Sequence, residues 1–117
     1  GYSTHLGVEA AKILLSQGIS AEVIDIRVLS PLSPQIILDS VRKTGRLIAI
    51  DGGWSPTGFA GEIIATISES IDPAQLKSAP KRITLPFAPA PAAANLESIY
   101  YPTPEDVVKI SLESLKR

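Results

Sequence analysis

The sequence predicts a three-layer α/β/α domain built on a mostly parallel sheet. Amphipathic helical stretches alternate with short β-branched apolar runs, in the order helix, strand, helix, strand, helix, strand, arm, helix. This alternation is typical of a sheet covered by helices on both faces. The length of 117 residues corresponds to one domain, residues 1–117, and a hydrophobic content of 44% suffices for a packed core.

The central unit of this pattern is residues 46–62, which read RLIAIDGGWSPTGFAGE. Residues 47–50 form a short apolar run, as expected for a buried parallel strand. The pair Gly52 and Gly53 then predicts a sharp turn, because glycine has no Cβ. From Phe59 onward apolar residues recur every four positions, so we expect a helix that continues to about Ile71.

The stretches before this unit repeat its pattern. Residues 6–17 are expected to form a helix, and residues 21–29, rich in β-branched side chains, a strand. A second helix is expected with Ser33 as its N-cap and Pro34 as its first residue. A glycine follows each predicted helix, where a C-terminal cap belongs.

The stretches after the central unit supply one more strand and one more helix. Residues 81–85 read KRITL and are expected to form a strand, and the proline-rich residues 86–94 are expected to run extended across the surface. Thr103, Pro104 and Asp106 form a T-x-x-D capping box with proline at the first helical position. This motif predicts the start of the last helix.

The alternation opens on a helix where a strand is expected. We therefore expect the sheet to lack its first strand in this chain and to be completed by an upstream segment or by another chain. The sequence also begins at Gly1 and contains no methionine, so we expect a piece of a longer subunit.

Composition and motifs argue against several classes of function. A net charge of −1 gives no global reason to expect nucleic acid or an anionic membrane as a partner. There is no cysteine, and no apolar run approaches the roughly 20 residues that span a bilayer. The single histidine, His5, is interpreted as a solvated residue at a helix start. On the residues alone, the chain is a packing or docking domain rather than a catalyst.

Two features of the sequence admit a phosphate-binding interpretation, and both favour a structural one. Gly52 and Gly53 precede a helix, but they match neither G-x-G-x-x-G nor the P-loop spacing. The basic cluster of Arg42, Lys43 and Arg46 follows a predicted helix C-terminus, which favours cations in any case. We therefore assign no catalytic, cofactor-binding or metal-binding residue.

Five blocks of the sequence carry a family resemblance: AEVIDIRVLSPL, SVRKTGRLIAIDGGWSPTGFAGEI, APKRITLP, the proline arm with NLE, and YPTPEDVV. Together they resemble the C-terminal domain of transketolase-type enzymes. More narrowly, they are similar to the β subunit of thiamine-diphosphate-dependent 2-oxo acid dehydrogenases of the pyruvate and branched-chain type. The resemblance covers nearly the whole chain and keeps the spacing between blocks.

The resemblance implies a role in an oxidoreductase complex. Such enzymes use thiamine diphosphate and Mg, which lie between other domains, so we expect this chain alone to bind neither and to be inactive in isolation. The implied partners are the remainder of the β subunit, an α subunit, a second β subunit and a dihydrolipoyl acyltransferase. The implied location is the bacterial cytoplasm or the mitochondrial matrix.

Two alternative functions remain open. The first is the C-terminal domain of a transketolase or a deoxyxylulose-phosphate synthase, which would contact a substrate phosphate. The KTGRL block and the proline arm favour the dehydrogenase instead. The second alternative is a stand-alone nucleotide-binding α/β module.

Four residues carry specific hypotheses. Trp54, the only tryptophan, and Phe59 are expected to pack at a subunit interface, because aromatic side chains dominate interface energetics. Asp106 and the terminal carboxylate at Arg117 are expected, on the family resemblance alone, to offer acidic contacts to a basic acyltransferase binding domain. For Asp106, a purely capping role is the competing interpretation.

Overall fold

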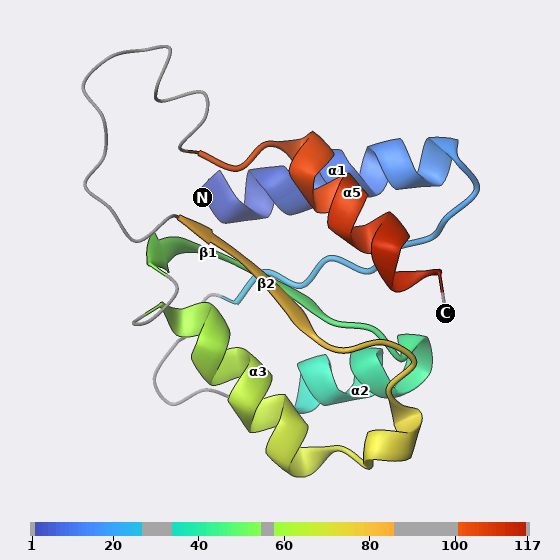
Figure 1. The fold of residues 1–117 in the computed structure, drawn as a ribbon, viewed down its shortest axis with the longest axis vertical. Coiled ribbons are helices and arrows are strands. Elements are labelled where there is room, and N and C mark those ends of the chain that lie inside the picture. Colours follow the sequence, from blue (N-terminus) through green and yellow to red (C-terminus); the bar gives the residue numbers. More distant parts are fainter. Residues whose placement is uncertain (1, 27–33, 55–57, 86–100, 117) are drawn as a thin grey trace.

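The structure is a computed structural model that describes residues 2–26, 34–54, 58–85 and 101–116. Two helices, α1 and α5, lie on one side of the strands, and α2 and α3 lie on the other (Figure 1). The three-layer α/β/α prediction is therefore confirmed. The elements in chain order are α1 (Tyr2–Ser16), α2 (Gln35–Thr44), β1 (Ile48–Trp54), α3 (Phe59–Ser70), the 3₁₀ turn η1 (Pro73–Gln75), β2 (Lys81–Leu85) and α5 (Pro104–Ser114).

Each side of the sheet has its own hydrophobic cluster. Side chains alternate along β1, so Ala49 joins the α2/α3 cluster while Ile48 and Ile50 pack against the α1/α5 cluster. Burial of an aliphatic side chain of this size contributes about 1.5–3 kcal/mol. The buried members are Ile37, Leu38, Val41, Ala49, Ala60, Ile63, Ile67 and Ile71 on one side, and Leu6, Ala10, Leu14, Ile83, Val107 and Val108 on the other.

The two strands pair in parallel, with Ile48 opposite Lys81 and Ile50 opposite Ile83. The predicted sharp turn at Gly52 and Gly53 is wrong, because β1 continues through both glycines to Trp54. Trp54 pairs with Leu85, so four steps along β1 match only two along β2. Glycines absorb such a register irregularity at little steric cost, and this explains their presence inside a strand.

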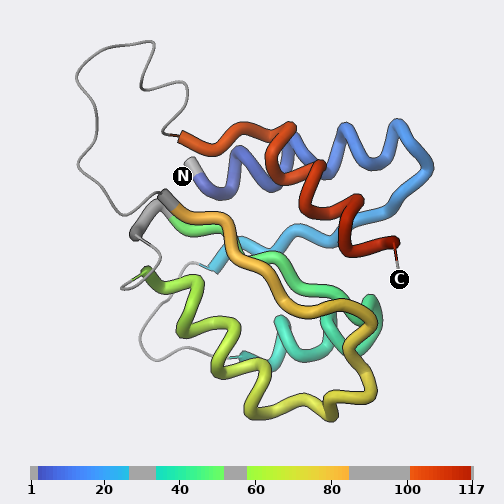
Figure 2. Tube along the Cα trace, viewed as in Figure 1, coloured from blue at the N-terminus to red at the C-terminus, as the bar shows by residue number. Residues whose placement is uncertain are grey.

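The predicted strand over residues 21–29 is wrong in its described part. Residues 21–26 belong to no strand, and residues 27–29 lie outside the described residues. A strand requires a hydrogen-bonded neighbour, and within the described ranges β1 pairs only with β2. Residues 19–26 run in the same direction as β1 and β2, between the two helical layers (Figure 2). Residues 21–26 carry the apolar β-branched pattern of a strand, but the described ranges contain no ladder partner for them.

The predicted glycine caps are confirmed. Gly18, at φ +80°, ends α1: its N–H donates to Leu15 O at 3.0 Å, and the Ile19 N–H donates to Leu14 O at 2.9 Å. This is the Schellman pair of bonds, which requires a left-handed residue. Gly45, at φ +75°, ends α2 in the same conformation.

The predicted start of the second helix is displaced by one residue. Helix α2 begins at Gln35, so Pro34 occupies the N-cap position rather than the first helical position. Ser33 and the proline arm over residues 86–94 lie outside the described residues. No helix in the described ranges is both long and apolar enough to cross a membrane.

Candidate functional site

The predicted interface residues flank the connection between β1 and α3. Trp54 is the last residue of β1, and its side chain lies outside the description. Phe59 is the first residue of α3 and is half-buried against the α2/α3 cluster. Phe59 therefore contributes to the domain's own core, while the interface role of both residues remains a prediction.

The N-terminus of α3 is capped by a carboxylate from β1. The N-cap residue, Gly58, has no side chain, and the Ala60 N–H instead donates to Asp51 Oδ2 at 3.0 Å. A helix N-terminus stabilises a negative charge through its free N–H groups and its dipole. The position expected for a bound phosphate in an α/β fold thus receives a carboxylate of the same chain. Sequence analysis did not assign this role to Asp51.

The basic cluster is engaged in contacts within the domain. The Lys43 ammonium and the Ser40 hydroxyl both donate to the carboxylate of Glu22, which joins α2 to residues 19–26. The hydrogen bond from Lys43, followed by the one from Ser40, lowers the pKa of Glu22 below its ordinary value. These contacts are solvent-exposed, so they contribute modestly and weaken with salt.

The other two cations of the cluster also have partners. Arg46 donates from Nε to Ser114 O at 3.0 Å, at the C-terminal end of α5. Arg42 lies 3.9 Å from Asp39 in an ion pair along α2. A guanidinium at a helix C-terminus satisfies free carbonyls and complements the dipole. These partners favour a structural role over a phosphate site for the three cations.

The last helix begins with the predicted capping box. The Asp106 N–H donates to Thr103 Oγ1 at 3.3 Å, and the Thr103 N–H donates to Asp106 Oδ2 at 2.8 Å. The capping role of Asp106 is therefore confirmed. Its carboxylate is still exposed to solvent, so a partner can reach it. Arg117 lies outside the described residues.

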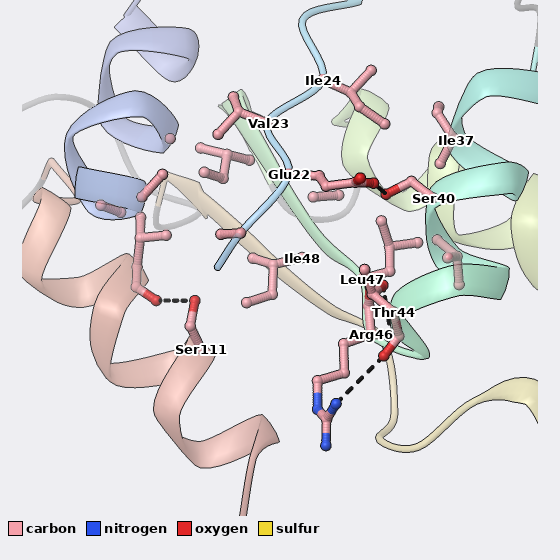
Figure 3. Close-up of a pocket in the computed structure, with 18 of the residues that line it drawn as sticks. Glu22, Val23, Ile24, Ile37, Ser40, Thr44, Arg46, Leu47, Ile48 and Ser111 are labelled. Atoms are coloured by element: carbon pink, nitrogen blue, oxygen red, sulfur yellow. Dashed lines mark hydrogen bonds between the residues drawn. The ribbon is translucent and has the colours of Figure 1, made fainter. Parts of the chain in front are cut away.

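A cavity of about 700 Å³ lies between residues 19–26 and β1, and α1, α2 and α5 also line it (Figure 3). Two of its hydroxyls bond to backbone carbonyls of the domain: Thr44 Oγ1 donates to Arg46 O at 3.1 Å, and Ser111 Oγ donates to Val107 O at 2.8 Å. Among the described residues, no buried side-chain nitrogen or oxygen lacks a partner, and no three metal-ligating side chains gather. The cavity lining is therefore more apolar than polar, and none of its buried polar side-chain atoms in the described ranges lacks a partner.

Comparison with known proteins identifies the fold family. The family described as "Transketolase, C-terminal domain" matches residues 1–107. The chain belongs to this family. The family prediction made from the five sequence blocks is thus confirmed, and the parallel strands with helices on both faces are consistent with it.

Three relatives illustrate the similarity within the transketolase C-terminal domain family. The acetoin:2,6-dichlorophenolindophenol oxidoreductase subunit beta of Bacillus subtilis (strain 168) is 41% identical over 98% of this chain and 33% of its own length. The pyruvate dehydrogenase E1 component subunit beta of Rickettsia bellii is 38% identical over 88% of this chain and 31% of its own length. The mitochondrial pyruvate dehydrogenase E1 component subunit beta of Caenorhabditis elegans is 41% identical over 92% of this chain and 31% of its own length.

The chain spans about a third of the length of these relatives. The predicted similarity to β subunits of dehydrogenases is confirmed by their names. The acetoin enzyme adds a substrate that the sequence analysis did not consider.

Proposed function

We propose that this chain is the C-terminal assembly and docking domain of the β subunit of a 2-oxo acid dehydrogenase. The complete enzyme would decarboxylate pyruvate or a branched-chain 2-oxo acid oxidatively and pass the acyl group to a lipoyl acyltransferase. The observation that carries this proposal is similarity along nearly the whole chain to β subunits of dehydrogenases. The proposed partners are the rest of the β subunit, an α subunit, a second β subunit and the acyltransferase.

Thiamine diphosphate and Mg²⁺ are proposed for the complete enzyme and not for this chain alone. The described residues do not fit such a group: no cluster of three metal-ligating side chains is present within them, and the α3 N-terminus already holds Asp51. Titrating the chain with thiamine diphosphate and with nucleotides tests this, because the docking-domain proposal expects neither to bind. Tight nucleotide binding would favour the stand-alone module.

The substrate of the complete enzyme needs a direct assay. Purified α and β subunits would be supplied with pyruvate, with branched-chain 2-oxo acids and with acetoin, and the rate of electron-acceptor reduction measured. Acetoin is included because the Bacillus subtilis relative, at 41% identity, is named for it. Turnover of a 2-oxo acid supports the proposal. Turnover of acetoin alone would show that acetoin, and not a 2-oxo acid, is the substrate. The proposed location is the bacterial cytoplasm or the mitochondrial matrix.

The proposed interface role of Trp54 predicts an assembly defect. Trp54→Ala should weaken oligomer assembly by about 2–4 kcal/mol, because a buried aromatic anchor carries a large share of interface free energy. Analytical ultracentrifugation measures this change. Phe59→Ala serves as a comparison. Because Phe59 packs on the α2/α3 cluster, that variant should lower the melting temperature of the domain in addition to weakening assembly. A Trp54→Ala enzyme that assembles normally but loses its cofactor would contradict the proposal.

The proposed docking role of Asp106 is tested separately. Asp106→Asn retains an oxygen that can accept the Thr103 N–H but removes the charge, so it separates docking from capping. We expect weaker acyltransferase binding and a shallower salt dependence, since ionic strength screens contacts between exposed charges. Asp72→Asn is the matched control, because Asp72 is also an exposed capping carboxylate. Unchanged affinity and salt dependence in Asp106→Asn would show that Asp106 only caps.

A further inference from the structure

One hydrogen bond joins the end of β1 to the start of α3 and encloses both aromatic residues of the proposed subunit interface. Asp51 Oδ2 accepts the Ala60 N–H, and Trp54 and Phe59 lie between these two residues in the sequence. We propose that Asp51 is a positioning residue for subunit association: its carboxylate fixes the α3 N-terminus against β1 and thereby sets where the two aromatic residues lie. This inference rests on the interface role proposed above for Trp54 and Phe59.

Water cannot replace the Asp51 carboxylate while α3 stays in its present position. Ala60 is 0% exposed, so its N–H is shielded from solvent, and a buried N–H without a partner is destabilising. The N-cap residue, Gly58, has no side chain that could accept this N–H. If the carboxylate is removed, the start of α3 must therefore move toward solvent or leave the amide unpaired. The position of the helix start thus depends on a residue of the preceding strand.

The end of β1 supplies both the carboxylate and Trp54. Asp51 lies two positions after Ala49, which belongs to the α2/α3 cluster, so the two side chains share the face of β1 that α3 covers. The pairing with β2 is irregular between Ile50 and Trp54, and Trp54 is then opposite Leu85. Because an irregularity of this kind bends a strand, the course of β1 is set before the chain reaches Trp54.

The start of α3 is packed as well as hydrogen-bonded. Ala60 belongs to the α2/α3 cluster, and Phe59 packs against that cluster. The backbone of Trp54 is held by its pairing with Leu85, and the backbone of Phe59 by the adjacent bond to Asp51. Aromatic residues whose backbone is fixed beforehand lose less conformational entropy when a partner binds, so this bond should favour association.

A purely local capping role for Asp51 is the competing interpretation, and a second cap separates the two. Gly58 has φ −76° and ψ 157°, which is the extended conformation of an N-cap residue with a side chain. In the double variant Asp51→Ala/Gly58→Asp, the new carboxylate can accept the Ala60 N–H from within the helix terminus. The double variant therefore restores the cap of α3 without restoring its link to β1.

Association of the purified α subunit with the full β subunit tests the proposal, measured by analytical ultracentrifugation below the melting temperature of every variant. We expect Asp51→Ala to weaken association by about threefold to tenfold, which corresponds to the loss of one capping bond. Asp51→Asn keeps an acceptor oxygen and should associate nearly as tightly as the parent. The double variant should match the parent in urea unfolding, yet associate as weakly as Asp51→Ala.

Restored association in the double variant would overturn the proposal, because a local cap would then suffice. If Asp51→Ala does not fold, the double variant decides alone. Asp72→Ala is the matched control, because Asp72 is a capping carboxylate just beyond the opposite end of α3. This control should associate like the parent, and a loss equal to that of Asp51→Ala would also overturn the proposal.

Trp54→Ala distinguishes failure of this inference from failure of the proposed function. If Trp54→Ala weakens association while Asp51→Ala does not, the interface role of Trp54 stands and the positioning role of Asp51 is wrong. If both variants associate like the parent, the interface role itself is wrong, and the positioning role falls with it.

Discussion

Removing the carboxylate of Asp51 should destabilise the start of α3. Asp51 Oδ2 accepts the Ala60 N–H at 3.0 Å, and the N-cap residue Gly58 makes no side-chain bond that could replace it. Loss of a capping bond costs about 0.5–2 kcal/mol. Loss of the charge at the helix N-terminus adds about 0.3–1 kcal/mol. We therefore expect Asp51→Ala to lower the free energy of unfolding by about 1–3 kcal/mol.

Two further variants separate the components of this effect. Asp51→Asn keeps an acceptor oxygen and removes the charge, so it should lose only the electrostatic share, about 0.3–1 kcal/mol. Asp72→Ala is a control: Asp72 accepts the Ala74 N–H at 2.9 Å, but it caps only the single turn η1 and is exposed. Asp72→Ala should therefore lower the free energy of unfolding by less than Asp51→Ala does.

Urea unfolding followed by circular dichroism measures all three differences under one set of conditions. A destabilisation below about 0.3 kcal/mol in Asp51→Ala would show that the cap contributes nothing measurable. Equal losses in Asp51→Asn and Asp51→Ala would show that the charge, and not the hydrogen bond, accounts for the whole effect.

Two other predictions concern packing and pH. Ile67 is 1% exposed within the α2/α3 cluster, so Ile67→Ala should cost about 2–5 kcal/mol in urea unfolding, and a loss below 1 kcal/mol would contradict this core assignment. The pKa of Glu22 is lowered by Lys43 and Ser40, so its contribution to stability is present above pH 4.5, its ordinary pKa, and is lost as the pH falls through the folded-state pKa. The stability difference between the parent and Glu22→Gln should therefore be larger at pH 7 than at pH 3, and a pH-independent difference would refute this.

The local motifs were predicted from the sequence because their chemistry is local. The Thr103 capping box and the left-handed caps at Gly18 and Gly45 each depend on neighbours within a few residues. The helix beginning at Phe59 was predicted because its four-residue apolar spacing matches one buried face.

The misassigned features depend on partners that are distant in the sequence. Residues 21–26 have the composition of a strand, but composition does not show whether a ladder partner is present. Gly52 and Gly53 were read as a turn because the register of β1 against β2 is set some thirty residues later. The sequence did not indicate the role of Asp51 for a similar reason. Its carboxylate accepts the Ala60 N–H only because the fold places the end of β1 beside the N-terminus of α3.

The packing of α1 against α5 has a consequence for biosynthesis. Leu6 and Val107 belong to one cluster, so this half of the interior forms from segments at opposite ends of the sequence. Closing a chain segment of roughly 100 residues costs about 4 kcal/mol of entropy before these contacts form. During translation, the part of the apolar face of α1 that packs on α5 would stay uncovered until α5 leaves the ribosome, whereas α2, β1 and α3 can pack earlier. Ribosome stalling before residue 104 would therefore leave a nascent chain that is a natural target for chaperones.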